Sequence, residues 1–178
     1  MDAAGETIVL LSRARPDRAG ARRLESDLVD LLAPSAPVLV ADDLYDQPDQ
    51  APLWDAVRAS CGPLLVLGWR PPRALYWLLR TRGVEGDRVD PGAPPGPGRP
   101  LVCLDLRSLA APVDALERLA GRLPPAAAAP LAVRLFPAAA RRWYPVLDLS
   151  RCSACGQCRE FCLFGVYRSE ERRVGKEC

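Results

Sequence analysis

The sequence predicts an α/β fold: a small domain with a parallel sheet between two layers of helices, followed by a compact cysteine-rich module. Across residues 1–122, short apolar runs alternate with segments in which leucine recurs at helical spacing. The apolar runs do not alternate with polar residues, which is typical of parallel strands covered by helices on both faces. Near the end of the chain, four of the seven cysteines lie within eleven residues.

Each expected strand precedes a helix in the chain. Residues 7–11 (TIVLL) form the first expected strand, and residues 21–32 place four leucines on one helical stripe. The same order recurs three times, so we expect a three-layer domain with a sheet of about four strands. The later strands are expected at residues 38–41, 64–68 and 101–106, and the later helices at residues 51–59, 74–82 and 113–119.

Proline-rich segments mark the joints of the chain. Residues 90–100 (DPGAPPGPGRP) carry too many prolines and glycines for a helix or a central strand, so we expect a loop there. Residues 123–142 are rich in alanine and proline and are predicted to be a semi-rigid linker with a docked segment at residues 133–136. The expected domains are therefore an α/β domain at residues 1–122 and a cysteine-rich module at residues 143–167.

The composition excludes several classes of function. The chain has 24 basic and 22 acidic residues, a net charge of +2, so it lacks the broad positive field that gathers nucleic acid or anionic membranes. It contains no histidine, which excludes Ser/His/Asp relays and histidine-ligated metal centres. No apolar run approaches the roughly 18 residues needed to span a bilayer, and the start lacks the basic region of a secretory signal. We therefore expect a cytoplasmic protein with no membrane span and no nucleic-acid partner.

The candidate ligand site of the α/β domain lies where the expected strands end. The chain contains neither GxGxxG nor a GxxxxGK P-loop, so phosphate sites of those two kinds have no support. In open parallel sheets, ligands bind beyond the carboxyl ends of the strands. Arg70 and Arg73 could clamp an anion there, and Trp69 or Tyr76 could stack on a ring such as a flavin. The candidates at these strand ends are Asp42, Asp43, Trp69, Arg70, Arg73 and Asp105.

An alternative interpretation gives the same residues structural roles. Asp42 and Asp43 would begin a turn, the arginines would be solvated, and Tyr76 and Trp77 would pack in the core. The small-molecule ligand of this domain is therefore left open. Cys103 lies inside an expected strand, where we expect it to behave as a small buried hydrophobic residue.

The most informative motif is the run CxxCxxCxxxC near the end of the chain. In a reducing compartment, grouped thiols are more often metal ligands than disulfides. The short spacing lets one loop wrap an inorganic core, and Gly156 supplies the permissive backbone that wrapping requires. The four candidate ligands are Cys152, Cys155, Cys158 and Cys162.

Three other interpretations fit the run less well. A structural zinc site usually separates its two cysteine pairs by roughly a dozen residues, whereas these cysteines follow one another closely. A radical-SAM site would need the order CxxxCxxC, which the run does not contain. Inert buried thiols seldom arise at this spacing from packing alone.

The run and its surroundings resemble the bacterial-type [4Fe-4S] ferredoxins, whose motif is CxxCxxCxxxCP. The likeness covers residues 143–167 and departs from the family at Leu163, where the family has proline. It implies an α+β ferredoxin-like module in which residues 144–149 form a strand and the four cysteines hold a [4Fe-4S] cluster. Phe161 and Phe164 would shield that cluster from water. It also implies an electron carrier or redox subunit, rather than a stand-alone enzyme, that serves a redox partner protein.

The end of the chain bears on the number of clusters. In two-cluster ferredoxins, the fourth cysteine of such a run ligates the other cluster, and a second motif downstream completes the first. Residues 168–178 (RSEERRVGKEC) resemble the translation of a widely used short-read sequencing adapter, and Lys176 is the only lysine of the chain. We therefore expect a non-native tail, a truncated module, and a second cluster motif beyond Tyr167 in the full-length protein. Two alternatives to electron transfer stay open: an α/β enzyme with an accessory cluster, and a structural zinc-binding interaction module.

Overall fold

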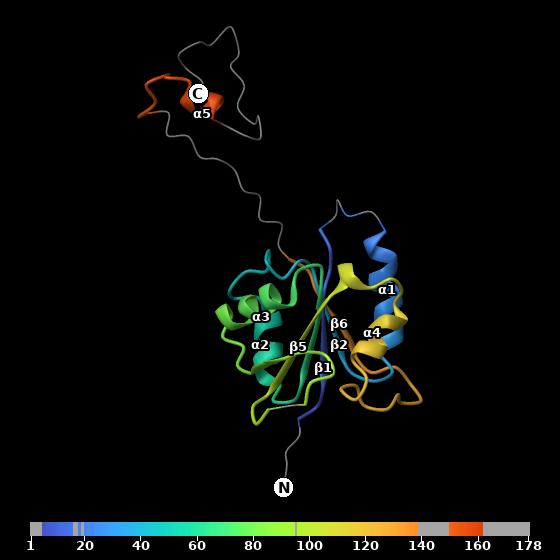
Figure 1. Ribbon diagram of the computed structural model, residues 1–178. Coiled ribbons are helices and arrows are strands. Elements are labelled where there is room, and N and C mark those ends of the chain that lie inside the picture. Colours follow the sequence, from blue (N-terminus) through green and yellow to red (C-terminus); the bar gives the residue numbers. More distant parts are fainter. Residues whose placement is uncertain (1–4, 16–17, 19, 95, 139–149, 162–178) are drawn as a thin grey trace. The chain divides into compact units, whose positions relative to one another are not determined.

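A computed structural model of the chain describes residues 5–15, 18, 20–94, 96–138 and 150–161 (Figure 1). The chain divides into two compact units, residues 1–141 and residues 142–178. Among the described helices, none is both long enough and apolar enough to cross a membrane.

The first unit is built on one six-stranded sheet, and every neighbouring pair of strands in it is parallel. The prediction of an α/β domain with a parallel sheet is therefore confirmed. The strands are β1 Ile8–Ser12, β2 Val38–Ala41, β3 Leu64–Gly68, β4 Asp87–Val89, β5 Pro100–Asp105 and β6 Val133–Phe136. Their order across the sheet is β4-β5-β3-β1-β2-β6.

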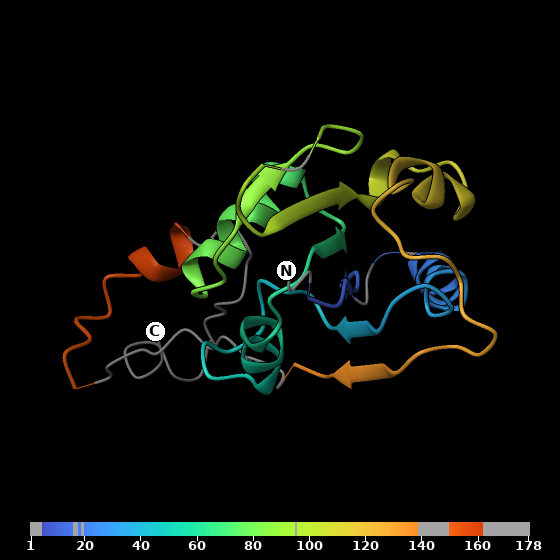
Figure 2. The same ribbon diagram turned by 90° about the horizontal axis from the view of Figure 1, so that it is seen from below.

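Helices cover both faces of this sheet, as Figures 1 and 2 show. Helices α1 (Ala21–Leu32) and α4 (Val113–Arg118) pack on one face, and α2 (Pro52–Ala59) and α3 (Pro72–Thr81) pack on the other. Successive strand residues belong to opposite faces, so the apolar strands fill two separate cores. In β1, for example, Val9 and Leu11 join the α1 side, and Leu10 joins the α2 side.

The sheet has two strands more than the sequence predicts, and both are edge strands. β4 is three residues long and exposes two of them, so it lacks the continuous apolar run of a central strand. β6 pairs with β2 in parallel, and Val133 and Leu135 remain exposed at 43% and 63%. The docked segment expected at residues 133–136 is therefore a strand of the sheet.

The chain before β6 is also attached to the first unit. The amide of Ala127 donates to the carbonyl oxygen of Pro34 at 2.7 Å, and the amide of Leu131 donates to that of Ala33 at 2.8 Å. These bonds fasten the segment to the end of α1. The sheet thus extends past the expected domain boundary at residue 122, and residues 123–142 are not a linker throughout.

The strand order places a topological switch next to β1. The chain runs from β1 to β2 on one side, and then returns to β3 on the other side of β1. The loop after β1 leads to α1 on one face of the sheet, and the loop after β3 leads to α3 on the other face. Because β1 and β3 are neighbours, the two loops diverge from adjacent strand ends and leave a crevice at the carboxyl edge of the sheet.

In the second unit, the described part is residues 150–161, with a short helix α5 at Gln157–Glu160. Several predictions fall outside the described residues. They are the strand at residues 144–149, the fourth cysteine Cys162, its neighbours Leu163 and Phe164, and the tail at residues 168–178.

Candidate functional site

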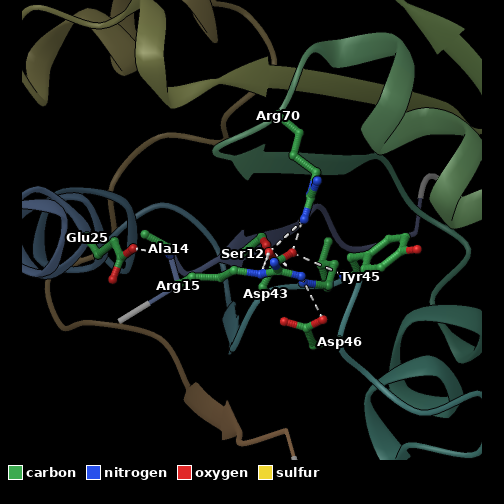
Figure 3. A network of polar contacts seen from close by, with 9 residues as sticks. Ser12, Ala14, Arg15, Glu25, Asp43, Tyr45, Asp46 and Arg70 are labelled. Carbon is green, nitrogen blue, oxygen red and sulfur yellow. Dashed lines mark hydrogen bonds and ion pairs between the residues drawn. The ribbon is translucent and has the colours of Figure 1, made fainter. Parts of the chain in front are cut away.

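A basic pocket lies at the topological switch of the first unit. It has a volume of about 460 Å³ and is formed by the loop after β1 together with the ends of β2 and β3. Figure 3 shows the polar network around it. The lining residues are Ser12, Arg13, Ala14, Arg15, Arg18, Asp43, Trp69 and Arg70.

Asp43 is the acidic centre of this network, with only 12% of its side chain exposed. Nη2 of Arg70 lies 2.8 Å from one carboxylate oxygen, and Nε of Arg15 lies 3.2 Å from the same oxygen. The backbone amide of Tyr45 donates to the other oxygen at 3.1 Å, which closes a tight turn after β2. Arg15 also binds Asp46 at 3.0 Å. The carboxylates of Asp46 and Asp43 together raise the pKa of Arg15.

A buried carboxylate of α1 holds two of the pocket's lining residues in place. Glu25 is 3% exposed and accepts the backbone amide of Ala14 at 2.5 Å and Nε1 of Trp69 at 2.9 Å. Arg22, one turn earlier on α1, pairs with its second oxygen at 3.0 Å. Since Ala14 follows β1 and Trp69 follows β3, this one side chain ties together both loops that border the crevice.

Two further arginines of the loop after β1 face the pocket. The guanidinium of Arg18 lies over the ring of Trp69, 4.3 Å from its centroid. Arg13 has no carboxylate within ion-pair distance in the part of the chain that the structure describes. The hydroxyl of Ser12, the residue before Arg13, is buried and accepts a hydrogen bond from the amide of Leu44 at 3.1 Å.

The structure brings together three of the six residues predicted at the strand ends, namely Asp43, Trp69 and Arg70. Asp42 instead accepts the amide of Ala138 at 3.0 Å and thereby fixes the chain after β6. Arg73 is exposed on α3 and is not among the lining residues, so the structure does not place it beside Arg70 as the other half of an anion clamp. Instead, Arg70 shares the carboxylate of Asp43 with Arg15 from the loop after β1.

The aromatic residues of α3 lie away from the pocket as well. Tyr76 packs against the core on the α2 side, and its ring meets that of Trp77 edge to face at 5.3 Å. Trp77 is 54% exposed, so the alternative in which both residues are core holds only for Tyr76.

Asp105, the last residue of β5, has a local structural role. It accepts the backbone amide of Arg107 at 3.0 Å and also pairs with its guanidinium, and so begins the short helix η1 at Leu106–Ser108. Burial raises the pKa of Asp105, but the hydrogen bonds and charge of Arg107 outweigh burial, and the pKa falls below its usual value.

A pH dependence of stability follows from this depressed pKa. A carboxyl group with a lower pKa in the folded state stabilises the fold above its unfolded pKa, and this contribution is lost as the pH falls through the folded pKa. Between about pH 5 and about pH 3, the free energy of unfolding is therefore expected to fall less in Asp105→Asn than in the wild type. Urea unfolding at a series of pH values measures this difference. Asp30→Asn, at an exposed position on α1, serves as the control and should follow the wild type. Parallel curves for Asp105→Asn and the wild type would contradict the expectation.

The sequence-based prediction missed Arg13, Arg15, Arg18 and Glu25. Three arginines in one turn-prone loop after the first strand were a usable signal, because that strand is central and borders the switch. Glu25 had its own signal. It occupies the buried stripe of α1 with Ala21, Leu28 and Leu32, where a carboxylate must find hydrogen-bond donors.

The second candidate site is the cysteine run of the second unit. The backbone amide of Ala154 donates to Sγ of Cys152 at 3.4 Å. Hydrogen bonds from the amide of Gln157 and from the side chain of Ser153 lower the pKa of Cys155. Ala154 and Gly156 adopt left-handed conformations with φ of 56° and 75°, so the backbone turns sharply between the cysteines.

The described part of this site does not by itself form a coordination sphere. Among residues that the structure describes, no three Cys, His, Asp or Glu side chains are gathered closely enough to hold a metal ion. Cys155 is exposed and Cys158 is partly buried. Phe161, expected to shield the cluster from water, is 77% exposed.

The cysteines of the first unit behave differently from those of the run. Cys103 is 2% exposed in β5, and burial raises the pKa of its thiol to about 12. The prediction of a small buried hydrophobic residue is therefore confirmed. Cys61 is exposed in the loop before β3.

Two sites of different chemistry thus stand in the two units: a basic pocket over a parallel sheet and a cysteine-rich loop. Comparison of the chain with protein-family models, with curated proteins and with solved structures finds no significant match.

Proposed function

We propose that the second unit binds a [4Fe-4S] cluster through Cys152, Cys155, Cys158 and Cys162, and that the protein transfers electrons to or from a redox partner protein. The observation that carries the proposal is the spacing CxxCxxCxxxC. Four thiols so close together, in a chain with no histidine, match the ligand chemistry of iron-sulfur clusters.

Features of the described loop support this donor set. A cluster needs thiolates, and the hydrogen bonds from Gln157 and Ser153 favour the thiolate form of Cys155. The amide that donates to Sγ of Cys152 is of the kind that stabilises negative charge on cluster sulfur. The left-handed turns at Ala154 and Gly156 allow the chain to curve around a compact core.

Each element of the loop has a distinct role in this proposal. The thiolates hold the iron, and the amides of the loop lower the energy of the negative charge that coordination and reduction bring. Metal binding is coupled to loop folding, so the thiolates are expected to converge as iron binds. The cluster, when bound, supplies one-electron transfer. The number and strength of the N–H to sulfur bonds then shift its reduction potential.

Reconstitution of the full chain with ferrous iron and sulfide under anaerobic conditions tests the proposal. We expect about four iron atoms per chain, together with broad thiolate-to-iron charge-transfer absorption that bleaches on reduction. A colourless protein that binds zinc in preference to iron would overturn the proposal and favour a structural zinc module.

The variant Cys162→Ser addresses the fourth ligand. If the four cysteines close one cluster within this chain, this variant should lose most of its iron and its charge-transfer absorption. Full iron content in Cys162→Ser would contradict the four-ligand assignment and would point to a ligand outside the run.

A further inference from the structure

The pocket at the carboxyl edge of the sheet carries an excess of positive charge. Its described lining includes four arginines against one aspartate, a net of three positive charges. Arg15 and Arg70 share the carboxylate of Asp43, and Arg15 also pairs with Asp46, whereas Arg13 has no acidic partner among the described residues. Guanidinium groups gathered around a concave site attract an anion, because the low-dielectric walls concentrate their field.

The place and size of the pocket suit a small molecule. It lies outside the carboxyl ends of β1, β2 and β3, at the switch point where open parallel sheets bind ligands. Its volume of about 460 Å³ falls within the range of roughly 300–1,000 Å³ typical of small-molecule sites.

Two backbone amides at the start of the loop after β1 are already bonded within the protein. The amide of Arg13 donates to the carbonyl oxygen of Ala41 at 2.8 Å, and the amide of Ala14 donates to Glu25. The loop after β1 therefore cannot offer these two amides to an anion, as a P-loop would. A guanidinium presents two parallel N–H groups, which match the oxygens of a phosphate.

Several of these donors are held in place before any ligand binds. Arg70 is fixed by Asp43, and its guanidinium also lies over the ring of Tyr45, 5.2 Å from the centroid. Arg18 lies on Trp69, whose indole N–H is bound by the buried Glu25. Side chains already ordered lose less entropy when a ligand binds, which favours affinity.

We propose that this pocket binds the phosphate or diphosphate group of a small molecule, with Arg13 and Arg70 as its main contacts. The proposal is independent of the iron-sulfur cluster, because every residue of the pocket belongs to the first unit. Loss of either site would leave the other testable in the same protein.

Titration calorimetry on the full chain with inorganic phosphate and with pyrophosphate, at low ionic strength, tests the proposal. We expect saturable binding of at least pyrophosphate, and an affinity about tenfold or more lower in Arg13→Gln and in Arg70→Gln. Neither change should unfold the protein. Asp43 keeps Arg15 as a partner when Arg70 is replaced, and Arg13 has no ion pair to lose among the described residues.

Arg73→Gln provides the matched control. It removes the same charge from an exposed position only three residues from Arg70, outside the pocket lining. We expect its affinity to stay within about twofold of the wild type, because exposed charges are screened by solvent. No pyrophosphate binding by the wild type, or equal losses in Arg73→Gln and Arg70→Gln, would overturn the proposal.

Discussion

Replacement of Cys155 by serine is expected to abolish cluster assembly, the largest functional effect that we predict for a single side chain. Serine has no thiolate, and the loop offers no histidine to replace it, because the chain contains none. Iron content and charge-transfer absorption after anaerobic reconstitution measure the effect. Both should fall to near the background of protein that has not been reconstituted.

Cys61→Ser is the matched control for this variant. Cys61 is an exposed free cysteine of the first unit, far in sequence from the cysteine run. Its replacement makes the same change of sulfur to oxygen outside the proposed ligand set. It should leave the iron content of the reconstituted protein unchanged. Equal iron in Cys155→Ser and Cys61→Ser would show that Cys155 is not a ligand.

Replacement of the buried Glu25 by alanine is expected to cause the largest loss of stability that we predict for a single side chain. It leaves the amide of Ala14 and the indole N–H of Trp69 without their acceptor. A buried donor without a partner costs about 1–3 kcal/mol, so the two together predict a loss of about 2–6 kcal/mol in the free energy of unfolding. Equilibrium urea unfolding of the full chain, followed by far-UV circular dichroism, measures this loss.

Two further variants sharpen this test. Glu25→Gln keeps one acceptor oxygen for the same two donors and should cost clearly less than Glu25→Ala. Glu117→Ala, at an exposed position on α4, should change the free energy of unfolding by no more than about 0.5 kcal/mol. If Glu25→Ala were as mild as Glu117→Ala, the buried network would contribute little to the fold.

The central strands were predictable because their signal is local. β1, β2, β3 and β5 are apolar over most of their length and are covered on both faces, so each stands out in its own stretch of sequence. β4 and β6 have one neighbour each and expose much of their surface. Their strand structure comes from pairing with β5 and β2, which no local pattern encodes.

The candidate pocket was only partly predictable, for a related reason. The rule that ligands bind at carboxyl strand ends selected Asp43, Trp69 and Arg70, which the structure places in the pocket lining. It could not assign partners, because Asp43 meets Arg15 across 28 positions of sequence and Arg70 across 27. The same rule also selected Arg73, which the course of α3 leaves exposed outside the pocket lining.

The sequence by itself determined the alternation of strands and helices and the spacing of the four cysteines, because both depend on residues close together in the chain. Only the tertiary structure decided that β6 completes the sheet, that Glu25 joins the loops after β1 and β3, and that the arginines after β1 share a pocket with Arg70. These contacts join segments far apart in sequence. Their geometry follows from the strand order, which brings the ends of β1, β2 and β3 together at one edge of the sheet.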